Sequence, residues 1–142
     1  MIKEVEKLAF KHEIIVQAGH SQYRSSKMKV FDFISPDELS RLYEKADYIV
    51  THGGAGSIFQ ALKSQKKTLV FPRLEKYGEH INDHQLQLAI KLESLGYLLV
   101  FNPDDEILDV FCELEKHEVK PYELEGNIST IIDKKLESIF NR

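Results

Sequence analysis

The stretch Tyr48–Leu62, with the sequence YIVTHGGAGSIFQAL, holds the residues best suited to bind a charged ligand. An apolar run ends at Thr51, three glycines follow, and Ser57 opens a new amphipathic segment. Glycines let an anion approach the backbone closely, because they carry no Cβ. A helix that begins there adds free N–H groups and the positive end of its dipole. The pattern predicts a pyrophosphate site on a glycine loop, which consists of His52, Gly53, Gly54, Ala55, Gly56 and Ser57.

The same glycines also suit a tight strand-to-helix turn, in which they serve only positive φ angles or close packing. The segment lacks the lysine of the P-loop and the GxGxxG spacing of the dinucleotide fingerprint, so neither ATP nor NAD is indicated. His52 either binds the ligand or bonds a backbone carbonyl. The glycine motif by itself leaves both the turn and the ligand site open.

A second polar cluster lies in the segment Glu75–Gly96, which covers the loop after the next apolar strand and the helix behind it. Loops that follow neighbouring strands of a parallel sheet face the same crevice, so this cluster is expected beside the glycine loop. Asp83, His84 and Gln85 would direct their donors and acceptors into that crevice. Amide and imidazole groups at a helix N-terminus suit a ligand with many hydroxyl groups.

The elements that must position these residues alternate between strand and helix periods, which favours an α/β fold with a parallel sheet. Apolar strands are expected at 13–18, 29–34, 47–51, 67–71 and 97–101. Helices are expected at 1–11, 35–46, 57–65, 82–95 and 127–140. The best-defined helix follows Ser35, which forms a capping box with Glu38 and precedes Pro36 at the first helical position. Gly96 is expected to stop the helix before the last strand.

Composition limits the class of protein. A chain of 142 residues is one domain by size, and its net charge of −4 disfavours nonspecific attraction to nucleic acid phosphates. A single cysteine cannot form an internal disulfide, and nothing resembles a signal peptide or a membrane-length apolar run. We therefore expect a cytoplasmic protein that does not bind nucleic acid.

Several other side chains have ordinary interpretations. His80 and His84 are four residues apart, but no glutamate follows His80 and no third ligand is evident, so no metal site is expected. Cys112 is predicted to be a buried hydrophobic residue, because no histidine pattern frames it. His20 and Tyr23 are interpreted as solvated loop residues that alternatively line an acceptor site. The acidic segment 104–126 is interpreted as a surface helix or a docking face.

The segments ADYIVTHGGAGSIFQALKSQKKTLVFP and NDHQLQLAIKLESLGYLL resemble the C-terminal, nucleotide-sugar half of family 28 glycosyltransferases. The resemblance extends over about residues 1–100. It is strongest to the small catalytic subunits of two-component transferases, both of bacterial capsule and exopolysaccharide synthesis and of the eukaryotic dolichol-linked GlcNAc pathway. The fold implied is a Rossmann-like parallel sheet with helices on both faces, which is half of a GT-B fold.

The resemblance also implies roles for individual residues. The backbone at Phe33 and Ile34 would meet the uracil, and the glycine loop would take the diphosphate. His84 and Gln85 would take the hydroxyls of the donor sugar. Gln60 stands where the family usually has a glutamate that holds the ribose, and an uncharged amide should bind that ribose more weakly. No cofactor is implied beyond the UDP-sugar donor.

Relatives begin with a strand and a loop of the type VTVGTHEQPF, whereas this sequence opens within the following helix. We therefore expect a sheet whose first strand is missing and whose free edge favours self-association or filling by another chain. The family's candidate general base lies in that segment, so no catalytic residue is assigned. The implied activity is transfer of a sugar from a UDP-sugar to a lipid-linked acceptor, with a longer N-terminus or a membrane-anchored partner. The alternative is a non-catalytic nucleotide-sugar-binding or scaffolding module.

Overall fold

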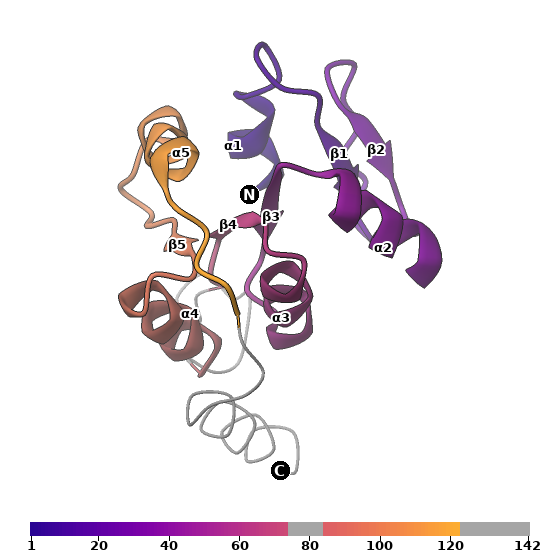
Figure 1. Cartoon of the computed structure of the whole chain (residues 1–142). Helices are drawn as coiled ribbons and strands as arrows, with labels where there is room; N and C mark the ends of the chain where they lie inside the picture. The colour runs from indigo at the N-terminus through magenta and orange to yellow at the C-terminus, as the bar shows by residue number, and fades with distance from the viewer. Residues whose placement is uncertain (74–83, 123–142) are drawn as a thin grey trace.

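Residues 1–73 and 84–122 are described in this computed structural model. In chain order the elements are α1 (Ile2–Glu6), β1 (Ile15–Gln17), β2 (Lys29–Phe31), α2 (Pro36–Lys45), β3 (Tyr48–Thr51), α3 (Ala55–Lys63), β4 (Lys67–Val70), α4 (His84–Ser94), β5 (Leu99–Val100) and α5 (Ile107–Lys116). Strands and helices alternate from β2 onward (Figure 1), which confirms the α/β class. The helix expected at 127–140 lies outside the described residues.

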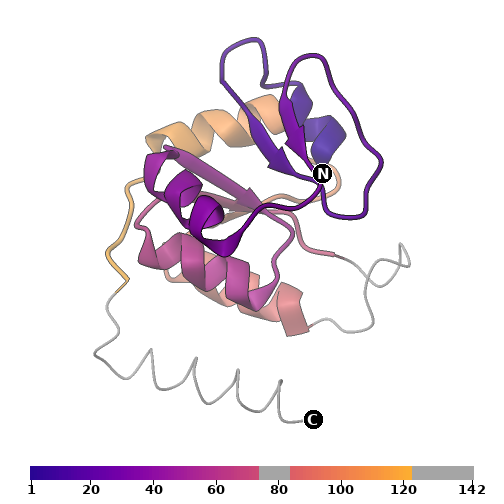
Figure 2. The same ribbon diagram turned by 90° about the vertical axis from the view of Figure 1, so that its right-hand side faces the viewer.

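The strands β3, β4 and β5 form a parallel sheet in that order, with β4 in the centre. Helices α3 and α4 cover one face of this sheet, and α1 and α5 cover the other (Figure 2). Alternating residues of β4 serve the two faces, because successive side chains of a strand point in opposite directions. Leu69 lies in the core beneath α1 and α5, and Val70 lies in the core beneath α3 and α4.

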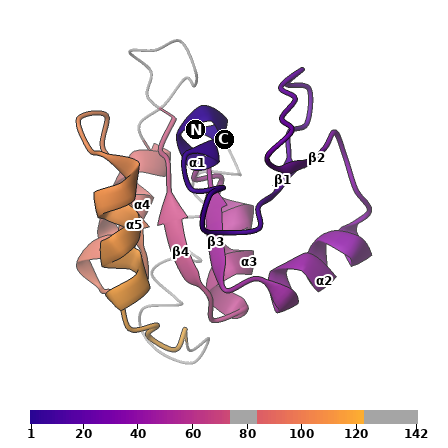
Figure 3. The ribbon, with the colours of Figure 1, turned by 90° about the horizontal axis from the view of Figure 1, so that it is seen from above.

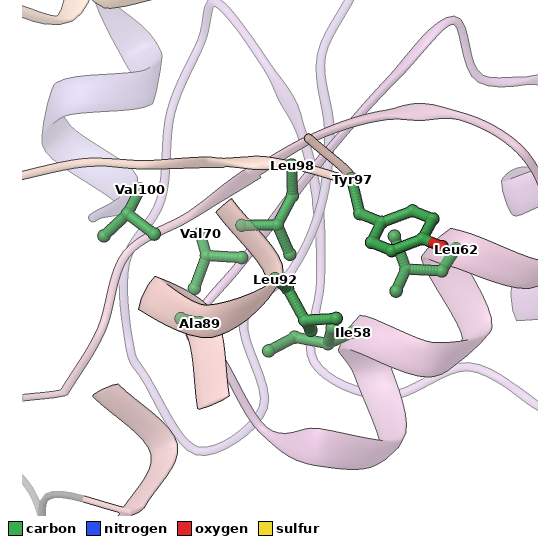
Figure 4. Packing of buried hydrophobic residues seen from close by; sticks show 8 residues of the cluster. All are labelled: Ile58, Leu62, Val70, Ala89, Leu92, Tyr97, Leu98 and Val100. Atoms are coloured by element: carbon green, nitrogen blue, oxygen red, sulfur yellow. The ribbon is translucent and has the colours of Figure 1, made fainter. Parts of the chain in front are cut away.

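The core on the α3 and α4 face fixes the two helices that begin beside the sheet's carboxyl edge. Ile58 of α3 and Leu92 of α4 are fully buried and meet Val70 of β4 in one cluster (Figure 4). Each buried aliphatic side chain contributes about 1.5–3 kcal/mol of hydrophobic stabilisation. The cluster therefore holds the N-termini of α3 and α4 in fixed positions relative to β4.

The single sheet expected from the sequence is divided. β1 and β2 form a separate parallel pair that stands apart from β3 (Figure 3), and no ladder joins β1 to β3. β1 already uses one edge for β2, since the Lys29 N–H donates to the Ile14 carbonyl. Backbone groups alternate between the two edges of a strand, so those of Ile15 and Gln17 face away from β2. We call the interval between β1 and β3 the sheet break.

Strand β3, on the other side of the sheet break, also directs backbone groups into the break. The Phe71 N–H donates to the Thr51 carbonyl, which directs Thr51 of β3 toward β4. The backbone groups of Val50 therefore face the break. Neither β1, β2 nor α2 contains a buried residue, and Phe31 of β2 is 45% exposed. Among the described residues, this part of the fold lacks the two-sided cover that a parallel sheet normally has.

The predicted capping box at the start of α2 is confirmed. Ser35 accepts a hydrogen bond from the Glu38 N–H, the Glu38 carboxylate accepts one from the Ser35 N–H, and Pro36 is the first helical residue. Gly96 ends the turn after α4 with a φ of 82°. Other boundaries shifted: α1 ends at Glu6, and α3 begins at Ala55 rather than at Ser57.

The prediction that Cys112 is buried was wrong, because its side chain is exposed. Helix α5 buries the stripe Ile107, Phe111 and Leu114 against the sheet. That spacing defines one helical face, and Cys112 follows Phe111 by one residue, about 100° around the helix. The acidic segment is thus partly a core helix with a charged outer face.

Candidate functional site

The glycine loop joins the end of β3 to the start of α3. Gly54 is the N-cap of the helix, and the Ile58 N–H donates to its carbonyl in the first intrahelical bond. The N–H groups of Ala55, Gly56 and Ser57 precede that bond and have no intrahelical acceptor. No side chain caps this end of α3. The loop therefore presents backbone donors and the positive end of the helix dipole.

Glycine stands at positions 53, 54 and 56 for different physical reasons. Gly53 has a φ of 88°, and a Cβ added there would lie 3.0 Å from Cγ1 of Val70, so this position requires glycine for the turn itself. A Cβ at Gly54 or Gly56 would meet no atom of residues 1–73 and 84–122 within 4 Å. Packing within these ranges does not explain the two glycines, and it leaves the space above them open to a ligand. The turn interpretation fits Gly53, and the ligand interpretation fits Gly54 and Gly56.

The second polar cluster begins at the neighbouring strand. β3 and β4 pair in parallel with Thr51 opposite Val70, so the segments that follow them leave the sheet side by side. Helix α4 returns with His84 and Gln85 in its first turn. The Gln85 Oε1 atom is buried and has no hydrogen-bond partner in the part of the chain that is described. A buried acceptor needs a hydrogen-bond donor, and the role of Gln85 toward a ligand stays a prediction. Asp83 lies outside the described residues.

His52 and Gln60 complete the predicted set on this sheet. His52 is half-buried and interacts with a neighbouring group, so the backbone-bonding interpretation and the ligand-binding interpretation both stand. Gln60 is half-buried in the second turn of α3, and its carbonyl accepts a hydrogen bond from the Ser64 hydroxyl. The role of the Gln60 amide stays a prediction.

Phe33 and Ile34 lie between β2 and Ser35, the N-cap of α2. The Phe33 side chain is 63% exposed, and its ring meets that of His20 edge to face at 5.1 Å between centroids. The turn after β1 is formed by Gly19, whose φ is 60°. Two exposed aromatic rings therefore stand at the carboxyl ends of β1 and β2, on the separate pair of strands.

Tyr43 of α2 is half-buried, and burial raises the pKa of its phenol. The side chain of Ser57 in the glycine loop lowers that pKa less strongly.

Other parts of the described chain offer little for a ligand. A hollow of about 330 Å³ lies at the opposite edge of the sheet, where β3 and β4 begin. Its two lysines already bond helix carbonyls: Lys66 Nζ donates to Glu44 at the end of α2, and Lys67 Nζ donates to Glu115 at the end of α5. Within residues 1–73 and 84–122, no cluster of His, Cys, Asp and Glu side chains suits a metal ion, and no helix could span a membrane.

Comparison with known proteins identifies the family. Residues 2–139 match the glycosyltransferase family 28 C-terminal domain. A UDP-N-acetylglucosamine transferase subunit ALG13 from Candida glabrata is 28% identical over 119 residues, which cover 82% of this chain and 57% of that protein. A Clostridium botulinum UDP-N-acetylglucosamine–N-acetylmuramyl-(pentapeptide) pyrophosphoryl-undecaprenol N-acetylglucosamine transferase is 32% identical over 105 residues, covering 74% of this chain and 26% of that protein.

Solved structures give a consistent picture of the fold. An NMR solution structure of ALG13 has a TM-score of 0.50 at 28% identity, covering 72% of this chain and 50% of that one. The crystal structure of the glycosyltransferase of kitacinnamycin has a TM-score of 0.64 at 21% identity and covers 84% of this chain and 31% of that one, which supports the fold alone. The chain thus spans from about a quarter to just over half of the length of these relatives.

Proposed function

We propose a function for this chain, which belongs to the family of glycosyltransferase family 28 C-terminal domains. The chain binds a UDP-sugar and, with a partner subunit, transfers the sugar to a lipid-linked acceptor. The observation that carries this proposal is the open space above Gly54 and Gly56 at the start of α3. These positions need no glycine for packing, and a diphosphate needs the room. The family match supplies the class of ligand, and the glycine loop supplies a place for it.

The diphosphate would lie against the backbone donors of the glycine loop. Negative charge grows on the β-phosphate oxygen as the bond to the sugar breaks. The free N–H groups at the start of α3 and the dipole of that helix stabilise this charge where it develops. Ser57 is exposed in the first turn and adds a hydroxyl donor. The loop thereby binds the donor and assists departure of UDP with groups that are already in place.

The donor sugar would lie toward α4. Gln85 carries a buried acceptor without a described partner, which suits a sugar hydroxyl or the N–H of an acetamido group. His84 is exposed beside it. The names of the curated relatives specify N-acetylglucosamine as their transferred sugar. We take UDP-N-acetylglucosamine as the donor of this chain, with the uracil near the backbone of Phe33 and Ile34 and the ribose near Gln60.

The acceptor and the general base are assigned to a partner. The Candida glabrata relative is by its name a subunit, and the Clostridium botulinum relative acts by its name on a pyrophosphoryl-undecaprenol substrate. A membrane-anchored partner would hold such a lipid at the cytoplasmic face and bring this chain to it. The sheet break leaves backbone groups of β1 and β3 free to pair with a strand of that partner or of a second copy. Capsule or another polysaccharide is the proposed product class.

A titration tests the proposal. We expect UDP and UDP-N-acetylglucosamine to bind the purified chain in calorimetry, and ADP, which has the same diphosphate, to bind more weakly because its base differs. Transfer to a lipid-pyrophosphate acceptor is expected once the membrane partner is present. Binding of the UDP-sugar without transfer in the presence of the partner would identify a non-catalytic module. If neither UDP nor UDP-N-acetylglucosamine binds to the chain, the proposal is overturned.

A further inference from the structure

Arg73 follows β4 at the carboxyl edge of the sheet, next to the glycine loop. Strands β3 and β4 pair in parallel as far as Thr51 and Val70. Two residues further along each strand, a Cβ built on Gly53 would lie 3.8 Å from Cα of Pro72. The two segments are therefore still neighbours where the glycine loop begins, and Arg73 is the residue that comes directly after this contact.

The Arg73 side chain is exposed and carries an unpaired charge in the described part of the chain. Within residues 1–73 and 84–122, its guanidinium forms no ion pair with a carboxylate. Arg24, by contrast, is paired with Asp32 at 3.2 Å. A guanidinium is a planar cation with five N–H donors, and its fork matches the spacing of phosphate oxygens. Arg73 thus offers charge and donors beside a loop that offers only backbone groups.

The glycine loop itself lacks a full positive charge. No lysine or arginine occurs in the sequence between Lys45 and Lys63, which includes the whole loop. The dipole at the start of α3 is equivalent to only about half an elementary charge. A single terminal phosphate already carries about 1.5–2 negative charges near neutral pH. A diphosphate on the loop therefore needs a further cation, and Arg73 is placed to supply it.

We propose that Arg73 is a phosphate-binding residue: its guanidinium donates to oxygens of the donor diphosphate on the glycine loop. The inference rests on the proposed function and deepens it, because it adds a residue for the same ligand. Hydrogen bonds between a guanidinium and a phosphate are about twice as strong as neutral ones. Arg73 thereby supplies the charge that the loop lacks, and the loop supplies the room.

Charge-removing variants of the whole chain test this role. UDP affinity is measured by calorimetry at low and at moderate salt, with uridine as a ligand that lacks phosphate. We expect Arg73→Gln to weaken UDP binding by about tenfold, the low end for a charge-assisted bond because the side chain is exposed. Arg73→Lys should lie between Arg73→Gln and the wild type, since it keeps the charge but loses the fork. Added salt should weaken UDP binding less in Arg73→Gln than in the wild type. Uridine affinity should stay unchanged throughout.

Lys45→Gln is the matched control, because it also removes one exposed positive charge but lies at the end of α2, before β3 begins at the opposite edge of the sheet. Its UDP affinity should equal that of the wild type. Equal losses in Lys45→Gln and Arg73→Gln would assign the effect to net charge and overturn the inference. Unchanged UDP affinity in Arg73→Gln, or equal losses for UDP and uridine, would also overturn it. If Gly54→Val still abolishes UDP binding, the proposed function stands in these cases; if Gly54→Val binds UDP normally, both fail.

Discussion

Gly53 and Val70 are packed so closely that a Cβ on Gly53 would lie 3.0 Å from Cγ1 of Val70, in the core between β4 and α3. The φ of 88° at Gly53 adds backbone strain for any other residue. We expect Gly53→Ala to lower the free energy of unfolding by about 1–3 kcal/mol, measured by urea denaturation.

The adjacent glycine provides the comparison. Gly54 has a φ of −59°, and no described residue lies within 4 Å of a Cβ added there. Gly54→Ala should therefore leave the free energy of unfolding within about 0.5 kcal/mol of the wild type. Equal destabilisation by Gly53→Ala and Gly54→Ala would contradict the division of the glycine loop into a structural and a ligand-facing part.

Gln85→Ala is predicted to weaken the binding of UDP-N-acetylglucosamine but not of UDP. A net hydrogen bond to a sugar hydroxyl contributes about 0.5–1.5 kcal/mol, which corresponds to a loss of about two- to twelvefold in affinity. Gln87→Ala is the control, since Gln87 lies on the exposed side of the same helix. Calorimetric titrations with both ligands check the prediction, and a similar loss for UDP would place Gln85 at the nucleotide instead.

The sheet break predicts a pattern of amide exchange. The N–H of Gln17 in β1 and of Val50 in β3 faces the break, whereas that of Thr51 faces β4. Gln17 and Val50 should exchange with solvent deuterium faster than Thr51 when measured residue by residue by NMR. Protection of Gln17 and Val50 at protein concentrations that favour dimers, but not on dilution, would indicate that a second copy fills the break. Strong protection of the Gln17 and Val50 amides in the monomer would contradict the conclusion that these edges of β1 and β3 are open.

Acid should loosen the loop between β1 and β2. The Glu6 carboxylate accepts hydrogen bonds from Ser25 and Tyr23, and these hold the pKa of Glu6 below its ordinary value of 4.5. A lowered pKa in the folded state stabilises the protein above the ordinary value, and that contribution is lost as pH falls through the lowered one.

The variant Glu6→Gln should accordingly melt at a lower temperature than the wild type at neutral pH. The difference should shrink as the pH falls below the ordinary range of a glutamate. Glu4→Gln is the control, because the Glu4 carboxylate forms a surface ion pair with Lys7, the C-cap of α1. Thermal melts across this pH range measure both variants. A difference between Glu6→Gln and the wild type that is independent of pH would contradict the assignment.

Features set by short-range rules were predictable from the sequence. The capping box of Ser35 and Glu38 defines the start of α2 through two bonds within four residues. The adjacency of the glycine loop and α4 follows from the parallel pairing of β3 and β4, which alternation of strands and helices implies. The expectation that Gln85 faces the site rested on the same rule and stays a prediction.

Features that depend on long-range packing were not predictable. The apolar character of β1 and β3 gives no sign that the two strands are separated, because each by itself is an ordinary strand. The family resemblance led us to expect a missing strand, but not its place in the sheet. The face of α5 that is buried depends on where the sheet lies, and so Cys112 was assigned to the wrong side.

The measurement that most directly tests the account is a calorimetric titration of UDP into Gly54→Val, with the fold checked by urea denaturation. A Cβ added at Gly54 meets no atom within 4 Å in the described part of the chain, so the variant should fold like the wild type. The same side chain occupies the space assigned to the phosphate oxygens. We predict no detectable UDP binding by the folded variant, and wild-type affinity for UDP in a folded Gly54→Val protein would contradict the account.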